Sequence, residues 1–405
     1  MSTAVVLNLP EAGHMNATLP VVAELVRRGE EVVYFATERY RGAIEAAGAR
    51  FMPYGDDDAF VPPAHRGGLF SVMAYLAALA ESVLPRVAAE TRAADPDYLL
   101  VDSMCLWGRY VQQLLRKPAI TLGSVFVPDE TRQDDESLVR EVYGALPRET
   151  ILAGIAALDS YLRTTRRIDR EHGTLSPGLV GFFASRQPLN ILFTSREFHV
   201  GGEAFDPATH HFVGPSIDDT ADDDEASLPF TPRGDRPLIY ISLGTIFNDD
   251  AQFYRDCFAA LGDGLYDVVL ATGAKVDVAE LGAIPKNFVV RAAVPQLPLL
   301  RRASLFITHA GMNSANEALW HGVPLVVRPR HGDQHLVAAR VVELGAGARL
   351  VNDATPAEIR AVVDRLLAAD SVRAAAAQIG ANLRAGGGFR RAADLITDYA
   401  REAAS

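Results

Sequence analysis

The sequence predicts an α/β protein built from two Rossmann-like, doubly wound domains that face each other across a cleft. Strand and helix signals alternate over residues 4–122, a segment without apolar periodicity interrupts the chain at residues 217–237, and the alternation then restarts. Alternating strands and helices form parallel sheets with helices on both faces. At 405 residues, the chain is also too long for one ordinary core.

The first half contains short apolar segments separated by helical patterns. Strands are expected at residues 4–9, 31–36, 97–101, 119–122 and 189–194. Helices are expected at residues 17–28, 41–47 and 106–115. Residues 54–90 and 128–186 break this rhythm as long helical insertions rich in Leu, Phe, Tyr and Met. Insertions at the carboxyl edge of such a sheet shape ligand pockets, although plain helical packing is an equally weighted alternative.

The second half repeats the alternation after the predicted linker, residues 217–237, whose acidic run at 218–225 is interpreted as a solvated tether rather than a metal site. Strands are expected at residues 238–241, 267–271, 287–290, 303–308, 325–328 and 347–351. Helices are expected at residues 251–261, 297–301, 315–320 and 335–344, with three closing helices within 356–403. The predicted domains are therefore residues 1–216 and 238–385, followed by a C-terminal segment, 386–405.

The composition argues against several classes of partner. A net charge of −12 and a pI near 5.3 disfavour a nucleic-acid duplex or an anionic membrane surface, which need clustered Lys and Arg. Residues 4–9 lack the features of a signal peptide, and the longest apolar stretch, 69–80, is shorter than a bilayer span, so no membrane insertion is expected. Cys105 and Cys257 lie far apart, which suggests no disulfide framework. The protein is expected to be soluble and cytoplasmic.

A turn at residues 309–314, between an expected strand and an expected helix, is predicted to bind an anion. Ser314 is expected to cap the helix, whose first backbone N–H groups carry a partial positive charge. Gly311 would let the backbone approach a phosphate closely. An ordinary capped turn is the alternative. Two further turns, residues 242–245 and 332–334, are expected at the same cleft, so a nucleoside diphosphate bearing a polar group is the expected ligand.

The first turn, residues 10–16, points to acid–base chemistry instead. It has no G-x-G-x-x-G pattern, which argues against a nicotinamide or flavin site. His14 is a candidate general base, although a lone histidine is more often structural. Asp102 ends the expected strand 97–101 and should project at the same edge of the sheet. A carboxylate there would fix the tautomer of His14 and stabilise the imidazolium.

Competing chemistries find less support. Ser103 and Cys105 lie near Asp102, but the absence of G-x-S-x-G argues against a hydrolase triad. His331 and His335 have helical spacing, with Asp333 between them. Without HExxH or a clear further ligand, no metal site is expected.

Taken together, these residues resemble the inverting nucleotide-sugar glycosyltransferases with the GT-B fold, the UDP-glycosyltransferase superfamily, and most closely the bacterial macrolide-type (antibiotic) enzymes. The resemblance runs along nearly the whole chain. Its motifs are Gly13-His14 with Asn16, the Asp102 strand end, Ser242-Leu243-Gly244-Thr245, Val294-Pro295-Gln296, His309 to Ser314 with Glu317, Gly322-Val323-Pro324, Asp333-Gln334, and the tail from Gly386-Gly387 to Asp394.

The resemblance implies a role for each of these residues. His14 would deprotonate an acceptor hydroxyl and Asp102 would orient His14. Glu317 would bind the ribose. The donor-binding set would be Ser242, Gly244, Thr245, Val294, Gln296, His309, Gly311, Met312, Asn313, Ser314, Glu317, Asp333 and Gln334. Within this set, Val294 and Gln296 would contact the base. Asp333 and Gln334 would bind the sugar. The helix expected at 389–400 would cross back onto the first domain.

The implied reaction transfers a hexose, glucose, from UDP-glucose to a hydroxyl of a hydrophobic natural product such as a macrolide, another polyketide antibiotic or a flavonoid. No cofactor or metal is expected, and the protein would be a monomer or homodimer. Ala293 stands where many members have a Trp that stacks on uracil, so a thymidine donor stays open; Arg328 and Arg330 contact the donor or lie exposed at the surface. A sugar-nucleotide epimerase and an inactive nucleotide-sugar binding protein are the alternatives.

Overall fold

The computed structural model describes residues 2–55, 57–61, 68–127, 148–178, 181–182, 187–218, 234–245, 248–330 and 332–404, and all structural statements concern these residues. Most of the predicted linker, part of the second predicted insertion and His331 lie outside them. The chain divides into two compact units. Unit 1 is Met1–Ile217 with Gly386–Ser405, and unit 2 is Asp218–Ala385.

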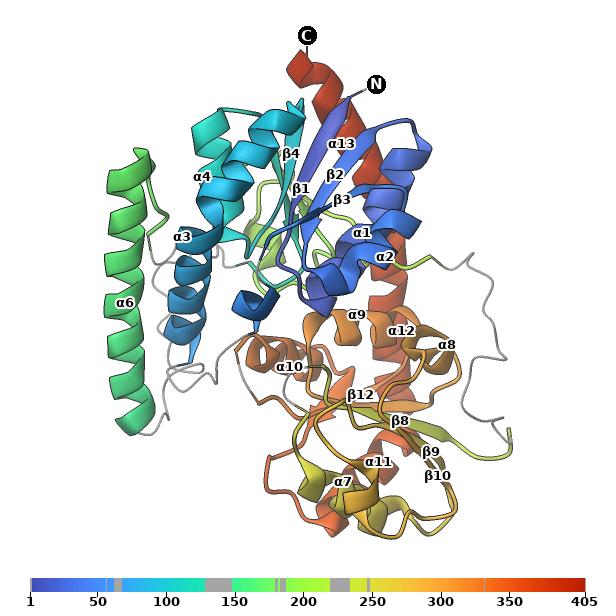
Figure 1. Ribbon diagram of the computed structural model, residues 1–405. Helices are drawn as coiled ribbons and strands as arrows, with labels where there is room; N and C mark the ends of the chain where they lie inside the picture. Colours follow the sequence, from blue (N-terminus) through green and yellow to red (C-terminus); the bar gives the residue numbers. More distant parts are fainter. Residues whose placement is uncertain are drawn as a thin grey trace. The chain divides into compact units, whose positions relative to one another are not determined.

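Unit 1 contains a parallel sheet of seven strands in the order β3-β2-β1-β4-β5-β6-β7 (Figure 1). The strands are β1 (Thr3–Leu7), β2 (Glu31–Ala36), β3 (Arg50–Pro53), β4 (Tyr98–Asp102), β5 (Ala119–Gly123), β6 (Leu189–Leu192) and β7 (His210–Phe212). The five strands expected in this half are confirmed. The outermost strands, β3 and β7, were not expected, because they are short and only partly buried and so lack an apolar run.

Helices cover both faces of this sheet. The helices of unit 1 are α1 (Ala12–Arg27), α2 (Arg41–Ala46), α3 (Leu69–Ala94), α4 (Leu106–Leu115), α6 (Arg148–His172), which packs on α3, and α13 (Gly388–Ala404). Alternate residues of β1 enter two different core clusters. Ala4 and Val6 pack with α1 and α13, whereas Val5 and Leu7 pack with α3 and α4. This alternation follows from the two-residue period of a strand and places the helices on opposite faces, as Figure 1 shows.

Helix α1 begins five residues earlier than the sequence predicts, at Ala12 instead of residue 17. The earlier start follows from burial, because Met15, Thr18, Val22 and Leu25 recur at helical spacing and are all buried. His14 therefore lies in the first turn of a helix, not in the loop before it. Near the other end of the helix, Arg28 pairs with Asp394 of α13 at 2.7 Å.

Helix α3 is much longer than the apolar stretch 69–80 that the sequence suggests. By length and composition its 26 residues could cross a membrane, with a mean hydropathy of 1.4 in its most apolar window. Half of that window is buried inside the structure. Its apolar residues pack with α4 and α6 in one core cluster. The prediction that this apolar segment is too short to span a bilayer is therefore wrong. Packing against α4 and α6 accounts for most of the apolar side chains in the first predicted insertion, residues 54–90.

Unit 2 contains a parallel sheet of six strands in the order β10-β9-β8-β11-β12-β13. The strands are β8 (Leu238–Ser242), β9 (Asp267–Ala271), β10 (Phe288–Arg291), β11 (Leu305–Thr308), β12 (Leu325–Val327) and β13 (Gly347–Arg349). The helices are α7 (Ala251–Leu261), α8 (Gln296–Leu300), α9 (Met312–Trp320), α10 (Gln334–Glu343), α11 (Pro356–Ala368) and α12 (Asp370–Ala385). The α/β class with two doubly wound parallel sheets is confirmed.

Candidate active site

Each sheet has one point where the strand order reverses, and several of the predicted site residues follow the strands that meet there. The neighbours at this point are β1 and β4 in unit 1, and β8 and β11 in unit 2. In open α/β sheets, ligands bind beyond the carboxyl ends of the strands at such a switch point. His14 follows β1 and Asp102 ends β4, whereas residues 242–245 follow β8 and residues 309–314 follow β11.

In unit 1, His14 and Asp102 are in direct contact. His14 Nδ1 lies 2.8 Å from Asp102 Oδ2, and their side chains are 13% and 0% exposed. The other carboxylate oxygen accepts a hydrogen bond from the backbone N–H of Met104 at 2.9 Å. The carboxylate therefore requires a proton on Nδ1 and assigns the role of proton acceptor to Nε2.

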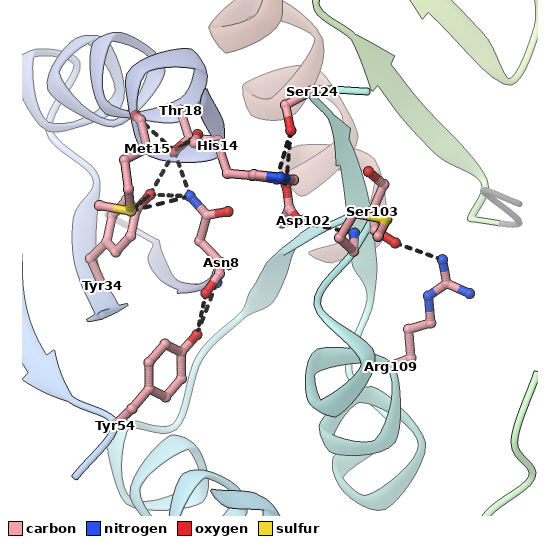
Figure 2. Close-up of polar contacts among 11 residues, drawn as sticks. Asn8, His14, Met15, Thr18, Tyr34, Tyr54, Asp102, Ser103, Arg109 and Ser124 are labelled. Atoms are coloured by element: carbon pink, nitrogen blue, oxygen red, sulfur yellow. Dashed lines mark hydrogen bonds and ion pairs between the residues drawn. The ribbon is translucent and has the colours of Figure 1, made fainter. Parts of the chain in front are cut away.

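Ser124, which the sequence analysis missed, completes this cluster. Its Oγ lies 2.7 Å from His14 Nδ1 and donates to Asp102 Oδ2 at 3.3 Å. Figure 2 shows the three side chains pointing toward one another from α1, the end of β4 and the end of β5. Ser124 follows β5 as Asp102 ends β4, so the same strand-end argument would have found it.

A buried polar network holds the first turn of α1 from the other side. Asn8 Nδ2 donates to Thr18 Oγ1 at 2.9 Å and to the Tyr34 hydroxyl at 2.5 Å. The Thr18 hydroxyl donates in turn to the backbone carbonyl of His14 at 3.0 Å (Figure 2). Because both the ring and the backbone of His14 are bonded, the imidazole is well oriented for general-base chemistry.

In unit 2, the helix at the predicted anion site begins earlier than expected. Helix α9 starts at Met312 with Gly311 as its N-cap, so the assignment of Ser314 as the cap is wrong. Glycine also serves at this position, and burial of the Met312 side chain favours the earlier start. The first-turn N–H groups of α9 thus belong to the predicted segment, and a helix N-terminus favours an anion.

His309 lies between two glycines. A Cβ at Gly244 would sit 2.5 Å from His309 Cε1, and one at Gly311 would sit 2.6 Å from Nε2. Gly311 is therefore needed to make room for the imidazole, a reason that the sequence did not suggest. Burial lowers the pKa of His309 to about 4, so the ring is neutral at pH 7. Ala310, between His309 and Gly311 in the chain, has a φ of 65°, which costs about 1–2 kcal/mol for a residue with a Cβ.

Gln296 and Glu317 contact each other. Gln296 Nε2 donates to Glu317 Oε2 at 2.5 Å and to Ser314 Oγ at 3.3 Å. Gln296 Oε1 accepts a hydrogen bond from the Tyr240 hydroxyl at 3.0 Å. Burial raises the pKa of Glu317 to about 7, and the hydrogen bond from Gln296 opposes this shift. Val294 is half-buried two residues before Gln296.

The other predicted donor residues have varied surroundings. Ser242 is buried and accepts a hydrogen bond from the backbone N–H of Gly244 at 3.3 Å, whereas Thr245 is exposed. Asp333 is the N-cap of α10. Gln334 is buried, and its Oε1 accepts from the backbone N–H of Arg330 at 2.9 Å. Asn313, like Ser314, is half-buried in the first turn of α9.

The two arginines before residue 331 form internal ion pairs. Arg328 and Arg330 both pair with Asp250, at 2.9 and 2.6 Å. Arg328 is 4% exposed and also donates to the backbone carbonyl of Asn352. Surface exposure is therefore wrong for Arg328. Asp250 accepts from the N–H of Phe253 at the start of α7, so these pairs connect two loops of unit 2.

Neither cysteine has the surroundings of a nucleophile. Both Cys105 and Cys257 are buried, and burial raises the pKa of each thiol. Across the part of the chain that the structure describes, no group of three His, Cys, Asp or Glu side chains is arranged to hold a metal ion.

Comparisons with known proteins identify the family to which the chain belongs. A family model described as "Erythromycin biosynthesis protein CIII-like, C-terminal domain" matches residues 257–386. The uncharacterized UDP-glucosyltransferase YojK of Bacillus subtilis is 32% identical over 99% of this chain and 98% of its own length. The oleandomycin glycosyltransferase of Streptomyces antibioticus is 30% identical over 95% and 87%. The solved structure of CalG4, the calicheamicin glycosyltransferase, is 28% identical over 100% of both chains, with a TM-score of 0.81. The chain therefore belongs to the bacterial antibiotic-type UDP-glycosyltransferases, a family of glycosyltransferases with the GT-B fold.

Proposed function

We propose that this glycosyltransferase transfers glucose from UDP-glucose to a hydroxyl of a hydrophobic natural product, with inversion and without a metal ion. The observation that carries the proposal is the contact between His14 and Asp102 at the switch point of unit 1. A histidine with a fixed tautomer and a carboxylate partner is suited to deprotonate an alcohol at neutral pH.

The substrates are inferred from two relatives. The donor follows from the relative named a UDP-glucosyltransferase, and a macrolide or similar acceptor follows from the relative named for oleandomycin. Ala293 leaves a thymidine donor open, because it offers no aromatic ring to stack on uracil. A nucleoside diphosphate suits unit 2, where the N-terminus of α9 and the His309 side chain lie together at the end of β11.

The proposed chemistry is a direct displacement at the anomeric carbon. The acceptor oxygen bonds to this carbon while the bond from the carbon to the β-phosphate oxygen breaks, and the nucleoside diphosphate leaves from the opposite face. His14 Nε2 takes the acceptor proton, and Asp102 stabilises the imidazolium that forms. The product therefore has the opposite anomeric configuration to the donor.

The leaving group gains negative charge as the bond breaks. In the proposal, the first-turn N–H groups of α9 and the helix dipole stabilise this charge. Neutral His309 contributes a hydrogen bond and not a full positive charge, because its pKa lies near 4 before the donor binds. Approach of the diphosphate would raise that pKa.

A product screen tests the reaction class. The purified protein is incubated with UDP-glucose or dTDP-glucose, alone and with a macrolide, an aromatic polyketide and a flavonoid, and the products are identified by mass spectrometry and NMR. We expect a new β-glycoside from an α-linked donor. An isomerised donor would instead indicate an epimerase, and saturable nucleotide binding without product would indicate a binding protein.

The His14→Ala variant and a chelator test the two chemical details. We expect His14→Ala to lose transfer while retaining nucleotide affinity, because His14 belongs to unit 1 and the proposed donor residues to unit 2. Near-native turnover with an alcohol acceptor would show that another group is the base. Activity should persist in EDTA. If EDTA abolished it and magnesium restored it, the metal-independent mechanism would be wrong.

A further inference from the structure

We infer that Tyr240 is a positioning residue of the nucleotide site, because its hydroxyl fixes Gln296 in the orientation that directs Glu317 toward a ribose. The inference rests on the proposed function and on the role that the family resemblance implies for Glu317, which is to bind the ribose of the donor. It adds a residue on β8 that the sequence analysis did not select, and it gives Gln296 a task other than contact with the base.

Tyr240 is held rigidly in the sheet of unit 2. It lies directly opposite Phe306 in the pairing of β8 with β11. The two rings stack with centroids 4.6 Å apart and planes 6° apart, and both side chains are buried. Aromatic pairs favour offset-stacked or edge-to-face arrangements, and a buried stacked pair limits the movement of each ring. The hydroxyl therefore has little freedom and donates to Gln296 Oε1 at 3.0 Å.

The Gln296 amide has its oxygen toward the Tyr240 hydroxyl and its NH₂ group toward Glu317. Because Oε1 accepts the Tyr240 proton, the NH₂ group is directed to Glu317 Oε2 at 2.5 Å and to Ser314 Oγ at 3.3 Å. A flipped amide would place its oxygen against the Glu317 carboxylate, and two acceptors repel each other unless the carboxyl is protonated. The Tyr240 hydroxyl thus favours the orientation that suits an ionised Glu317.

Glu317 needs this support because its surroundings disfavour the charge. Burial raises the pKa of its carboxyl, whereas the hydrogen bond from Gln296 lowers it. An ionised carboxylate can accept hydrogen bonds from both ribose hydroxyls, but a protonated one has a reduced capacity to accept. Tyr240 therefore acts on the ribose through two intermediate side chains.

Tyr240→Phe separates this role from core packing, because phenylalanine retains the ring that stacks on Phe306. The control is Tyr266→Phe, which removes a buried tyrosine's hydrogen bond to Asp364 of α11 in the same unit. Isothermal titration calorimetry measures the Kd of UDP and of 2′-deoxy-UDP for the wild type and both variants. The ratio of the two Kd values reports recognition of the 2′-hydroxyl, which a general loss of stability would not change.

We expect Tyr240→Phe to weaken UDP binding by about 3- to 10-fold, the range for one lost hydrogen bond, and to reduce the preference for UDP over 2′-deoxy-UDP. Tyr266→Phe should keep the wild-type preference. In a Glu317→Ala background, Tyr240→Phe should cause no further loss, because the two residues act in one chain of contacts. A folded Tyr240→Phe variant with the wild-type preference would refute the role of Tyr240 alone. A wild-type protein that binds neither nucleotide would refute both this inference and the proposed donor site.

Discussion

Each unit places a histidine and a carboxylate near its switch point, but the two pairs are arranged differently. In unit 1, His14 and Asp102 are bonded to each other at 2.8 Å. In unit 2, Glu317 is bonded to the neutral amide of Gln296, and His309 is packed between two glycines. Burial raises the pKa of Glu317 to about 7 and lowers that of His309 to about 4.

The difference shows how one topology can serve two chemical tasks. A histidine bonded to a carboxylate is prepared to become a cation, because the anion stabilises the charge that proton transfer creates. A histidine and an acid that are desolvated separately both favour their neutral forms before a ligand arrives. Unit 1 is therefore suited to move a proton, and unit 2 is suited to form hydrogen bonds with a polar ligand.

The largest expected effect comes from breaking the pair in unit 1. Asp102→Asn keeps the size of the side chain but removes the charge that stabilises the imidazolium. We expect kcat to fall by about 100- to 10,000-fold, as for a histidine that loses its carboxylate partner, with little change in the Kd of UDP. Steady-state kinetics with the acceptor from the product screen provide the measurement.

Asp95→Asn is a control with the same chemical change. Asp95 is exposed and forms a surface ion pair with Lys117, so this variant should retain wild-type kcat. If Asp102→Asn also kept near-native turnover, Asp102 would be a structural carboxylate, and the contrast between the two units would lose its functional meaning.

A smaller effect is expected from crowding His309 in unit 2. Gly311 has a φ of −63°, which alanine tolerates, so Gly311→Ala adds only a methyl group, 2.6 Å from His309 Nε2. The ring must move, which we expect to destabilise the fold by about 1–3 kcal/mol and to weaken UDP binding at least about 10-fold. Thermal denaturation and calorimetric titration measure the two effects.

The His309→Ala background identifies the cause of this effect. Without the imidazole, the methyl group of Gly311→Ala should cost almost no stability, because the clash is with the ring. Gly42→Ala, at a glycine of α2 where a Cβ would meet nothing within 4 Å, should leave UDP binding unchanged. An equal loss of stability with and without the His309 ring would mean that the glycine serves the backbone instead.

The sequence predicted the parallel sheets well because buried strands of such sheets are continuous apolar runs. The edge strand β7 escaped detection, since three residues with two histidines carry no such signal. The partnership of His14 with Asp102 followed from strand ends that meet at one edge, and Ser124 obeys the same geometry.

Other features depend on packing that a pattern of residue types does not contain. From the sequence alone, Tyr240 is indistinguishable from any core residue of a strand. Only the structure shows that its hydroxyl contacts Gln296. The space that Gly311 leaves is defined by the ring of His309, which comes from the preceding strand end. Residue preference predicts Ser314 as the N-cap, whereas burial of Met312 favours an earlier start of the helix.

The last expected effect is on fold stability alone and concerns the carboxyl of Glu317, which is bonded to a neutral amide and not to a charged partner. Its pKa is about 7 in the folded protein, whereas the ordinary pKa of a glutamate is near 4.5. Because the folded protein binds the Glu317 proton more tightly than the unfolded chain does, the folded state is favoured most below pH 4.5. This contribution decreases as the pH rises above 4.5 and is lost once the pH has passed 7. Glu317→Gln does not ionise, so it should be more stable than the wild type at pH 8, by about 1–3 kcal/mol, and the gain should shrink toward pH 5.

Urea denaturation at pH 8 and pH 5 measures this pH dependence. Glu343→Gln, at an exposed glutamate of α10 that pairs with Arg340, should show no comparable change between the two pH values. A Glu317→Gln gain of the same size at both pH values would mean that packing, not ionisation, separates variant from wild type. The raised pKa of Glu317 would then have no measurable consequence for stability, and the contrast between the two units would rest on the histidines alone.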